Sequence, residues 1–153
     1  MGKILVNKVE LTQEEGIFMY TVIRFNIPSE MDILSPVVIQ LGELINEKDS
    51  NTFKGEFDTC GNRISLDVAK NQNWEILIDS IISAINNFDK VIKYANTNGI
   101  RIELDIAFYA SDLKDDYISF TWECSYSFLK LLVDNQITLV HTYYDDVERV
   151  AAE

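Results

Sequence analysis

The side chains best suited to chemistry in this sequence are one histidine and two cysteines. His141 lies in an expected strand near the C-terminus, Cys60 precedes an expected strand, and Cys124 precedes an expected helix. A lone histidine acts as a general base only where a carboxylate orients it, and it cannot build a multi-histidine metal site. Without Cys-x-x-Cys spacing, a Cys–His nucleophile could be assembled only by the fold. We therefore predict that His141 is part of a sheet face and that the chain has no catalytic residue.

Oxygen ligands and glycines give no stronger signal. Acidic residues cluster at 112–116 and at 145–148. The first cluster reads Asp-Leu-Lys-Asp-Asp, which lacks the alternating ligands and turn glycine of a calcium loop. The six glycines are scattered and form no phosphate-binding loop. We predict no metal site and no cofactor.

The chain is strongly acidic, with 25 Asp and Glu against 13 Lys and Arg and a net charge of −12. Nucleic-acid affinity comes largely from neutralising phosphates with basic groups, so a nucleic-acid partner is not expected. Such a charge attracts a basic protein partner over long range. It also serves simply to keep a cytosolic protein soluble, which is the plainer interpretation.

Length and composition indicate one domain over residues 1–153. With 153 residues, 47% of them hydrophobic, the chain can bury a single core. Its apolar runs are broken well before the ~18 residues that a membrane span needs, and the apolar run near residue 1 is too short for a signal peptide. We expect a cytoplasmic protein with reduced thiols and no membrane association.

Strands are expected where β-branched and aromatic residues alternate with polar ones. Residues 3–11 and 17–27 flank Glu14-Glu15-Gly16 and predict a hairpin. A second hairpin is expected over 100–122, with a strand at 117–122. The segment 46–62 is polar and reads as a long loop with a short irregular strand around 53–57, and loops of that length are often functional. Further strands are expected at 63–68 and 137–144.

Three helices are expected from apolar residues at helical spacing. Ser35 and Pro36 begin one over 36–46, as N-cap and first helical residue. The longest spans 72–97, with a bend near Asn86-Asn87 and Gly99 just past its end. An alternative makes 74–78 a strand and begins that helix at 79. Ser125 caps the third.

Together these elements predict an α+β fold in the order ββαβαββαβ. Mixed helices and hairpins favour a two-layer sandwich, with a largely antiparallel sheet and the helices on one face. It would be a ferredoxin-like sheet with additions.

The other face of that sheet is the candidate binding surface. Tyr and Arg are enriched at protein interfaces, whereas the alternative is an ordinary solvated face of an antiparallel sheet. Alternation places on this face Tyr20, Arg24, Arg63, Asp67, Arg101, Glu103, Asp105, Tyr109 and Thr121.

Over residues 17–144 the chain resembles the bacterial domain-of-unknown-function family 4279. The likeness includes the Leu/Ile-rich long helix and rests on short motifs, namely Ile39-Gln40-Leu41-Gly42, Lys54-Gly55-Glu56, Ile64-Ser65-Leu66, the Asn98-Gly99-Ile100-Arg101-Ile102-Glu103-Leu104 transition and Phe128-Leu129-Lys130-Leu131-Leu132. The resemblance implies a small bacterial protein with no established activity. Some such domains look like immunity proteins, the cytoplasmic inhibitors of toxins.

Three functional hypotheses follow. The first is a non-enzymatic protein-interaction module, of immunity type against a basic toxin in its most specific form. The second is a small-ligand-binding or hydrolytic domain with a pocket near the 46–62 loop, lined by His141, Cys60 or Cys124. The third is a homodimer formed through an unpaired edge strand.

Overall fold

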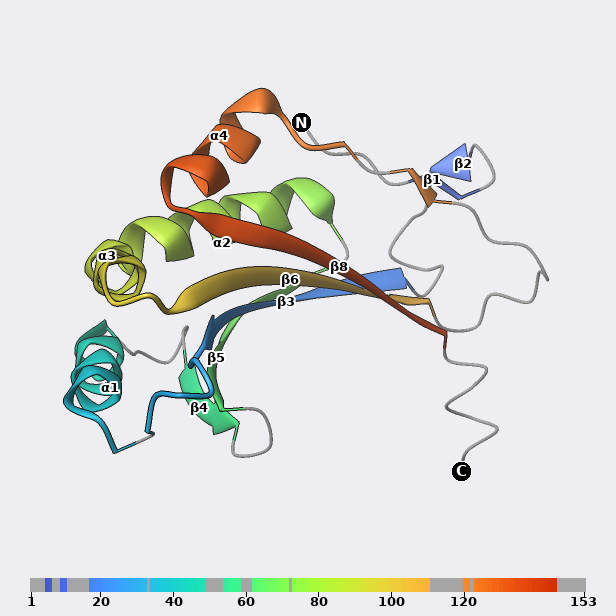
Figure 1. Ribbon diagram of the computed structural model, residues 1–153. Helices are drawn as coiled ribbons and strands as arrows, with labels where there is room; N and C mark the ends of the chain where they lie inside the picture. Colours follow the sequence, from blue (N-terminus) through green and yellow to red (C-terminus); the bar gives the residue numbers. More distant parts are fainter. Residues whose placement is uncertain are drawn as a thin grey trace.

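The structure is a computed structural model that combines helices with β-sheet (Figure 1). It describes residues 5–6, 9–10, 17–32, 34–48, 54–58, 62–71, 73–110, 120–121 and 123–145. Along the chain the elements are β1 (Leu5–Val6), β2 (Val9–Glu10), β3 (Ile17–Asn26), α1 (Pro36–Lys48), β4 (Lys54–Asp58), β5 (Arg63–Asn71), α2 (Trp74–Asn87), α3 (Asp89–Thr97), β6 (Arg101–Ala110), β7 (Phe120–Thr121), α4 (Tyr126–Asp134) and β8 (Ile137–Asp145).

The main sheet has five strands in the order β4-β5-β3-β6-β8. The first three pairings are antiparallel, and β8 joins β6 in parallel. The expected mixed α+β fold is therefore confirmed. A β-bulge between Thr21 and Val22 shifts the register of β3 against β5, and such a bulge bends and twists the strand locally.

The two predicted hairpins, at 3–27 and 100–122, are wrong. The strands β1 and β2 pair with each other, and β1 also pairs with β7, in a small second sheet. The physical reason is length, because β3 and β6 each have ten residues and pair along their full extent. That pairing buries far more apolar surface than short local hairpins would. The predicted element order ββαβαββαβ is accordingly replaced by the order given above.

Three other strand predictions hold. Both β5 and β8 cover their expected ranges, and the short strand around 53–57 is confirmed as β4, which pairs with β5. Since α1 continues to Lys48, helix and strand take up much of the expected 46–62 loop. Residues 49–53 and 59–61 lie outside the described part.

The expected 72–97 helix is broken at Phe88 into α2 and α3, close to the predicted bend. The alternative strand at 74–78 is wrong, because the Asn73 side chain caps a helix there by accepting from Ile76 N. At the end of α3, Ile100 N donates to Ala95 O and Gly99 adopts φ 74°. This is the Schellman arrangement that a C′ glycine makes possible.

The apolar core of the described residues lies between the helices and the main sheet. The buried residues of β6 at alternating positions, Ile102 to Phe108, meet those of β3 and β5 and the inner sides of α1, α2 and α3. Figure 1 shows α2, α3 and α4 on one side of the sheet, with α4 over β8. The opposite side chains of the same strands form a second, polar face.

Candidate binding face of the sheet

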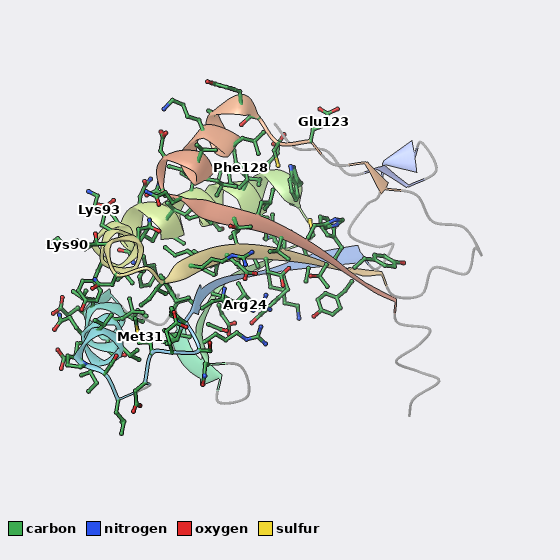
Figure 2. All side chains as sticks on the ribbon, viewed as in Figure 1. Arg24, Met31, Lys90, Lys93, Glu123 and Phe128 are labelled. Atoms are coloured by element: carbon green, nitrogen blue, oxygen red, sulfur yellow. The ribbon has the colours of Figure 1, made fainter. Side chains whose placement is uncertain are left out.

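Of the nine residues predicted for the candidate binding surface, all except Thr121 lie on the sheet face away from the core. On β3, Tyr20 and Arg24 alternate with the buried Met19, Ile23 and Phe25. The same alternation places Arg63 on β5, and on β6 Arg101, Glu103, Asp105 and Tyr109. Figure 2 labels Arg24 on the side of the sheet opposite Phe128 of α4. We call this surface the open face. Its residues come from strands far apart in the sequence.

The centre of the open face is an ion pair that joins three strands. Arg24 Nη1 lies 2.5 Å from Asp105 Oδ2, and Thr142 Oγ1 donates to Asp105 Oδ1 at 2.9 Å. Asp105 is only 6% exposed, whereas the Arg24 side chain is 23% exposed. Because both carboxylate oxygens accept from neighbours, the buried charge of Asp105 is satisfied. The group fixes β3, β6 and β8 to one another.

Toward the Asn26 end of β3 the face continues through Glu103. Asn26 Nδ2 donates to Glu103 Oε1 at 2.7 Å, and Arg101 Nη2 lies 3.9 Å from the same oxygen. The Arg101 side chain is 64% exposed, so its guanidinium keeps most of its donors available to a partner. Arg63 lies opposite Asn26 in the β3–β5 register.

At the other end of β3, Tyr20 Oη donates to Asp67 Oδ1, which links β3 to β5. Tyr109 lies opposite Phe18 in the β3–β6 register, beyond this link. The prediction that Thr121 lies on the open face is wrong. Thr121 lies on β7, which pairs with β1 in the small sheet. Among the described strands, β7 pairs with β1 and with no strand of the main sheet.

Sequence reasoning missed two members of the network, Asn26 and Thr142. Asn26 continues the alternation of Tyr20 and Arg24, so the pattern contained that signal. Thr142 belongs to the network only because β8 pairs with β6 in parallel, which puts Thr142 opposite Ala107. No local pattern indicates which strand is the neighbour of another.

Among the described side chains of the open face the formal charges nearly cancel, although the chain is strongly acidic. Its described side chains carry three carboxylates, Asp67, Glu103 and Asp105, and four cations, namely Arg24, Arg63, Lys70 and Arg101. The net charge of −12 therefore comes from the rest of the chain. A partner meets paired charges here and not an acidic field.

His141 lies on the helix-covered side of β8, in register with Ile106. Its ring meets Phe108 edge-on at a centroid distance of 4.7 Å, and Phe108 stacks on Trp74 at 6.1 Å. Burial lowers the pKa of His141, and the Asp105 carboxylate opposes that shift. The prediction that His141 belongs to a sheet face is confirmed.

Cys124 is half-buried, and burial raises the pKa of its thiol to about 11. The nucleophilic form of a cysteine is the thiolate, so the raised pKa disfavours nucleophilic chemistry by this side chain at neutral pH. Cys60 lies outside the described residues, as do the acidic cluster at 112–116 and residues 146–148. Within the described ranges no group of three or more His, Cys, Asp or Glu side chains could hold a metal ion.

The strand order places His141 far from the 46–62 segment, although both were expected to line one pocket. His141 lies on β8 and the residues of that loop lead into β4, at opposite edges of the sheet. Four strand spacings of ~4.8 Å put these edges about 19 Å apart. This distance argues against His141 lining a pocket beside β4.

Comparisons with protein families, curated proteins and solved structures find no match to this chain. The resemblance to domain-of-unknown-function family 4279 stays a prediction. Among the described helices, none combines the length and the apolar character needed to cross a membrane.

Proposed function

We propose that this chain is a non-enzymatic protein-interaction module whose partner docks on the open face. The observation that carries the proposal is the network from Tyr20–Asp67 through Arg24–Asp105–Thr142 to Asn26–Glu103–Arg101. Tyr and Arg are favoured at interfaces. Side chains already held by neighbours lose little conformational entropy when a partner binds.

The charge distribution supports a basic partner in two ways. A net charge of −12 accelerates the approach of a cationic protein. Contact at a nearly neutral face then avoids burying a large uncompensated charge. An immunity-type inhibitor of a basic toxin, acting in a bacterial cytoplasm, is the most specific form of this proposal.

The chemistry of the described side chains supports binding over catalysis. The Cys124 thiol is held in its protonated form, and the His141 ring packs edge-on against Phe108. The alternative, a small-ligand-binding or hydrolytic domain near residues 46–62, has no comparable geometric support, since His141 lies at the far sheet edge from β4.

We also propose that the fold is a two-layer sandwich that elaborates the ferredoxin-like pattern. That pattern interlocks two β-α-β units in the order βαββαβ. The series β3, α1, β4, β5, α2 with α3, and β6 supports the assignment, as does the strand order β4-β5-β3-β6. α4 and β8 are then the addition. A solved structure with another order of these strands would contradict it.

The test uses a charge-matched pair of variants, Arg101→Glu on the open face and Lys90→Glu on α3. Both side chains are exposed and both substitutions change the charge by the same amount. Affinity capture from the source cells is followed by titration of the captured protein against each variant. We expect a basic partner whose Kd rises at least about tenfold with Arg101→Glu and little with Lys90→Glu.

An equal response of the two variants would show that only net charge matters and would overturn the open-face site. Loss of binding through unfolding is excluded by thermal denaturation of both variants. Failure of the wild-type chain to bind any basic protein would remove the proposal itself.

A further inference from the structure

The outer edge of β8 is a long strand edge that no described strand pairs with. Its nine residues, Ile137–Asp145, contain no proline, glycine or lysine, and the only charge is that of Asp145 at the end. Proteins normally protect free edges with charges, prolines or short strands. The opposite edge follows this rule, because β4 has five residues of which Lys54, Glu56 and Asp58 are charged.

Beside this edge, α4 carries a stripe of exposed apolar side chains. Tyr126 is 81% exposed, Val133 73% and Leu129 41%, whereas Phe128 and Leu132 of the same helix are buried. Their spacing of three and four residues puts the three exposed side chains on one side of the helix. Since Leu131, on the opposite side of α4, packs against the core, we infer that the stripe points away from the other helices.

The charge along this part of the chain differs from that of the whole molecule. Between Cys124 and Tyr144 the only formal charges are Lys130 and Asp134, which form an i,i+4 ion pair. The segment therefore has no net charge, although the chain carries −12. Two copies of so acidic a chain repel each other, so a contact between them requires a neutral surface. The 124–144 segment provides it.

We propose that a second copy of this chain docks against β8 and α4. A two-fold axis perpendicular to the sheet would pair β8 antiparallel with its counterpart and join the two five-stranded sheets. It would also place the two α4 helices side by side, with Tyr126 near the partner's Val133 and the two Leu129 residues close to the axis. Such isologous contacts are the commonest form of self-association. Exposed apolar patches beside a strand edge are typical docking sites.

The contact approaches the size of a standard protein interface. Nine strand residues extend about 30 Å, and one strand layer plus one helix layer is about 20 Å deep. The face is thus on the order of 600 Å² before surface relief, against about 800 Å² per partner in a standard interface. The proposed dimer leaves the open face accessible, so it does not depend on the function proposed above.

The first test is the mass of the full chain by sedimentation equilibrium over about a hundredfold range of concentration. We expect twice the 17.6-kDa chain mass. Val133→Glu should raise the dimer Kd by about a hundredfold or more, because it places a carboxylate from each copy in an apolar contact. The matched control is Ile39→Glu on α1, which changes an apolar residue of 50% exposure and should leave the dimer intact.

The second test locates the axis. In a background where Cys60 and Cys124 are replaced by serine, Leu129→Cys should form a disulfide-linked dimer under mild oxidation, and Ile39→Cys should not. A wild-type monomer at every concentration would overturn the proposal and assign the stripe to a different partner. A dimer that dissociates with Ile39→Glu but not with Val133→Glu would overturn it equally.

Discussion

The two faces of the main sheet hold their side chains by different means. Next to one another on β3, Phe25 is fully buried under the helices, whereas Asn26 on the open face is hydrogen-bonded to Glu103. One face is stabilised by burial of apolar area and the other by pairing of polar atoms. The same strand therefore tolerates change very differently at consecutive positions.

The largest loss of stability is expected when a large buried side chain is truncated on the helix-covered face. Phe25→Ala should lower the free energy of unfolding by about 3 to 5 kcal/mol, because it loses buried area and leaves a cavity. The matched change on the open face, Asn26→Ala, should cost about 1 kcal/mol, one net hydrogen bond. Urea denaturation of both variants measures the difference. Equal losses would contradict the division between the faces.

A smaller loss of stability is expected when one partner of the ion pair on the open face is removed. Asp105→Leu leaves the Arg24 guanidinium without its carboxylate and should cost about 2 kcal/mol, less than for a fully buried pair, since Arg24 is 23% exposed. The double variant Arg24→Met/Asp105→Leu should recover much of that loss. If the double variant is as unstable as the single one, the ion pair is not the cause.

Removing a polar atom from the buried face should raise the free energy of unfolding, the opposite of the changes above. Thr21 is fully buried, and its Oγ1 has no hydrogen-bond partner among the residues that the structure describes. Thr21→Val replaces the hydroxyl with a methyl group of similar shape and should stabilise the fold by about 1 kcal/mol. Thr21→Ser, which keeps the hydroxyl and loses the methyl group, is the control. A destabilised Thr21→Val would mean that the hydroxyl is paired.

The smallest expected effect is the contribution of His141, on β8, to the pH dependence of stability. The pKa of His141 is lowered from 6.5 in the folded chain, so the unfolded chain binds more protons just below that pH. The contribution of His141 is complete above pH 6.5 and declines as the pH falls toward the folded pKa. The urea midpoint should fall less between about pH 7 and about pH 5 in His141→Gln than in the wild type. A steeper fall would show that His141 gains protons on folding.

Periodicity in the sequence was sufficient to assign the faces of single strands. Alternation along 17–27, 63–68 and 100–108 placed Tyr20, Arg24 and Asp105 on the open face, as the structure has them. It could not name neighbouring strands, because alternation reports which side is buried and not what lies beside it. For that reason two hairpins were wrong, Thr121 was misplaced and Thr142 was missed.

Helices were predicted more closely, since their signals are local. Capping by Ser35 and the glycine after α3 depend only on adjacent residues, and both act as predicted. The binding role of the open face is a different kind of prediction, because no alternation pattern distinguishes a docking surface from a solvated one.

The break between α2 and α3 has a mechanical consequence. Phe88 ends one helix and begins the next, and its ring is almost completely buried in the core. A straight helix from Trp74 to Thr97 would be about 36 Å long and would diverge from a sheet that twists beneath it. The break at Phe88 lets α2 and α3 each follow the twisted sheet. Because the Phe88 ring is anchored in the core, we expect this joint to be less flexible than one formed by glycine or proline. The joint between the two helices is thus anchored in the core by one side chain.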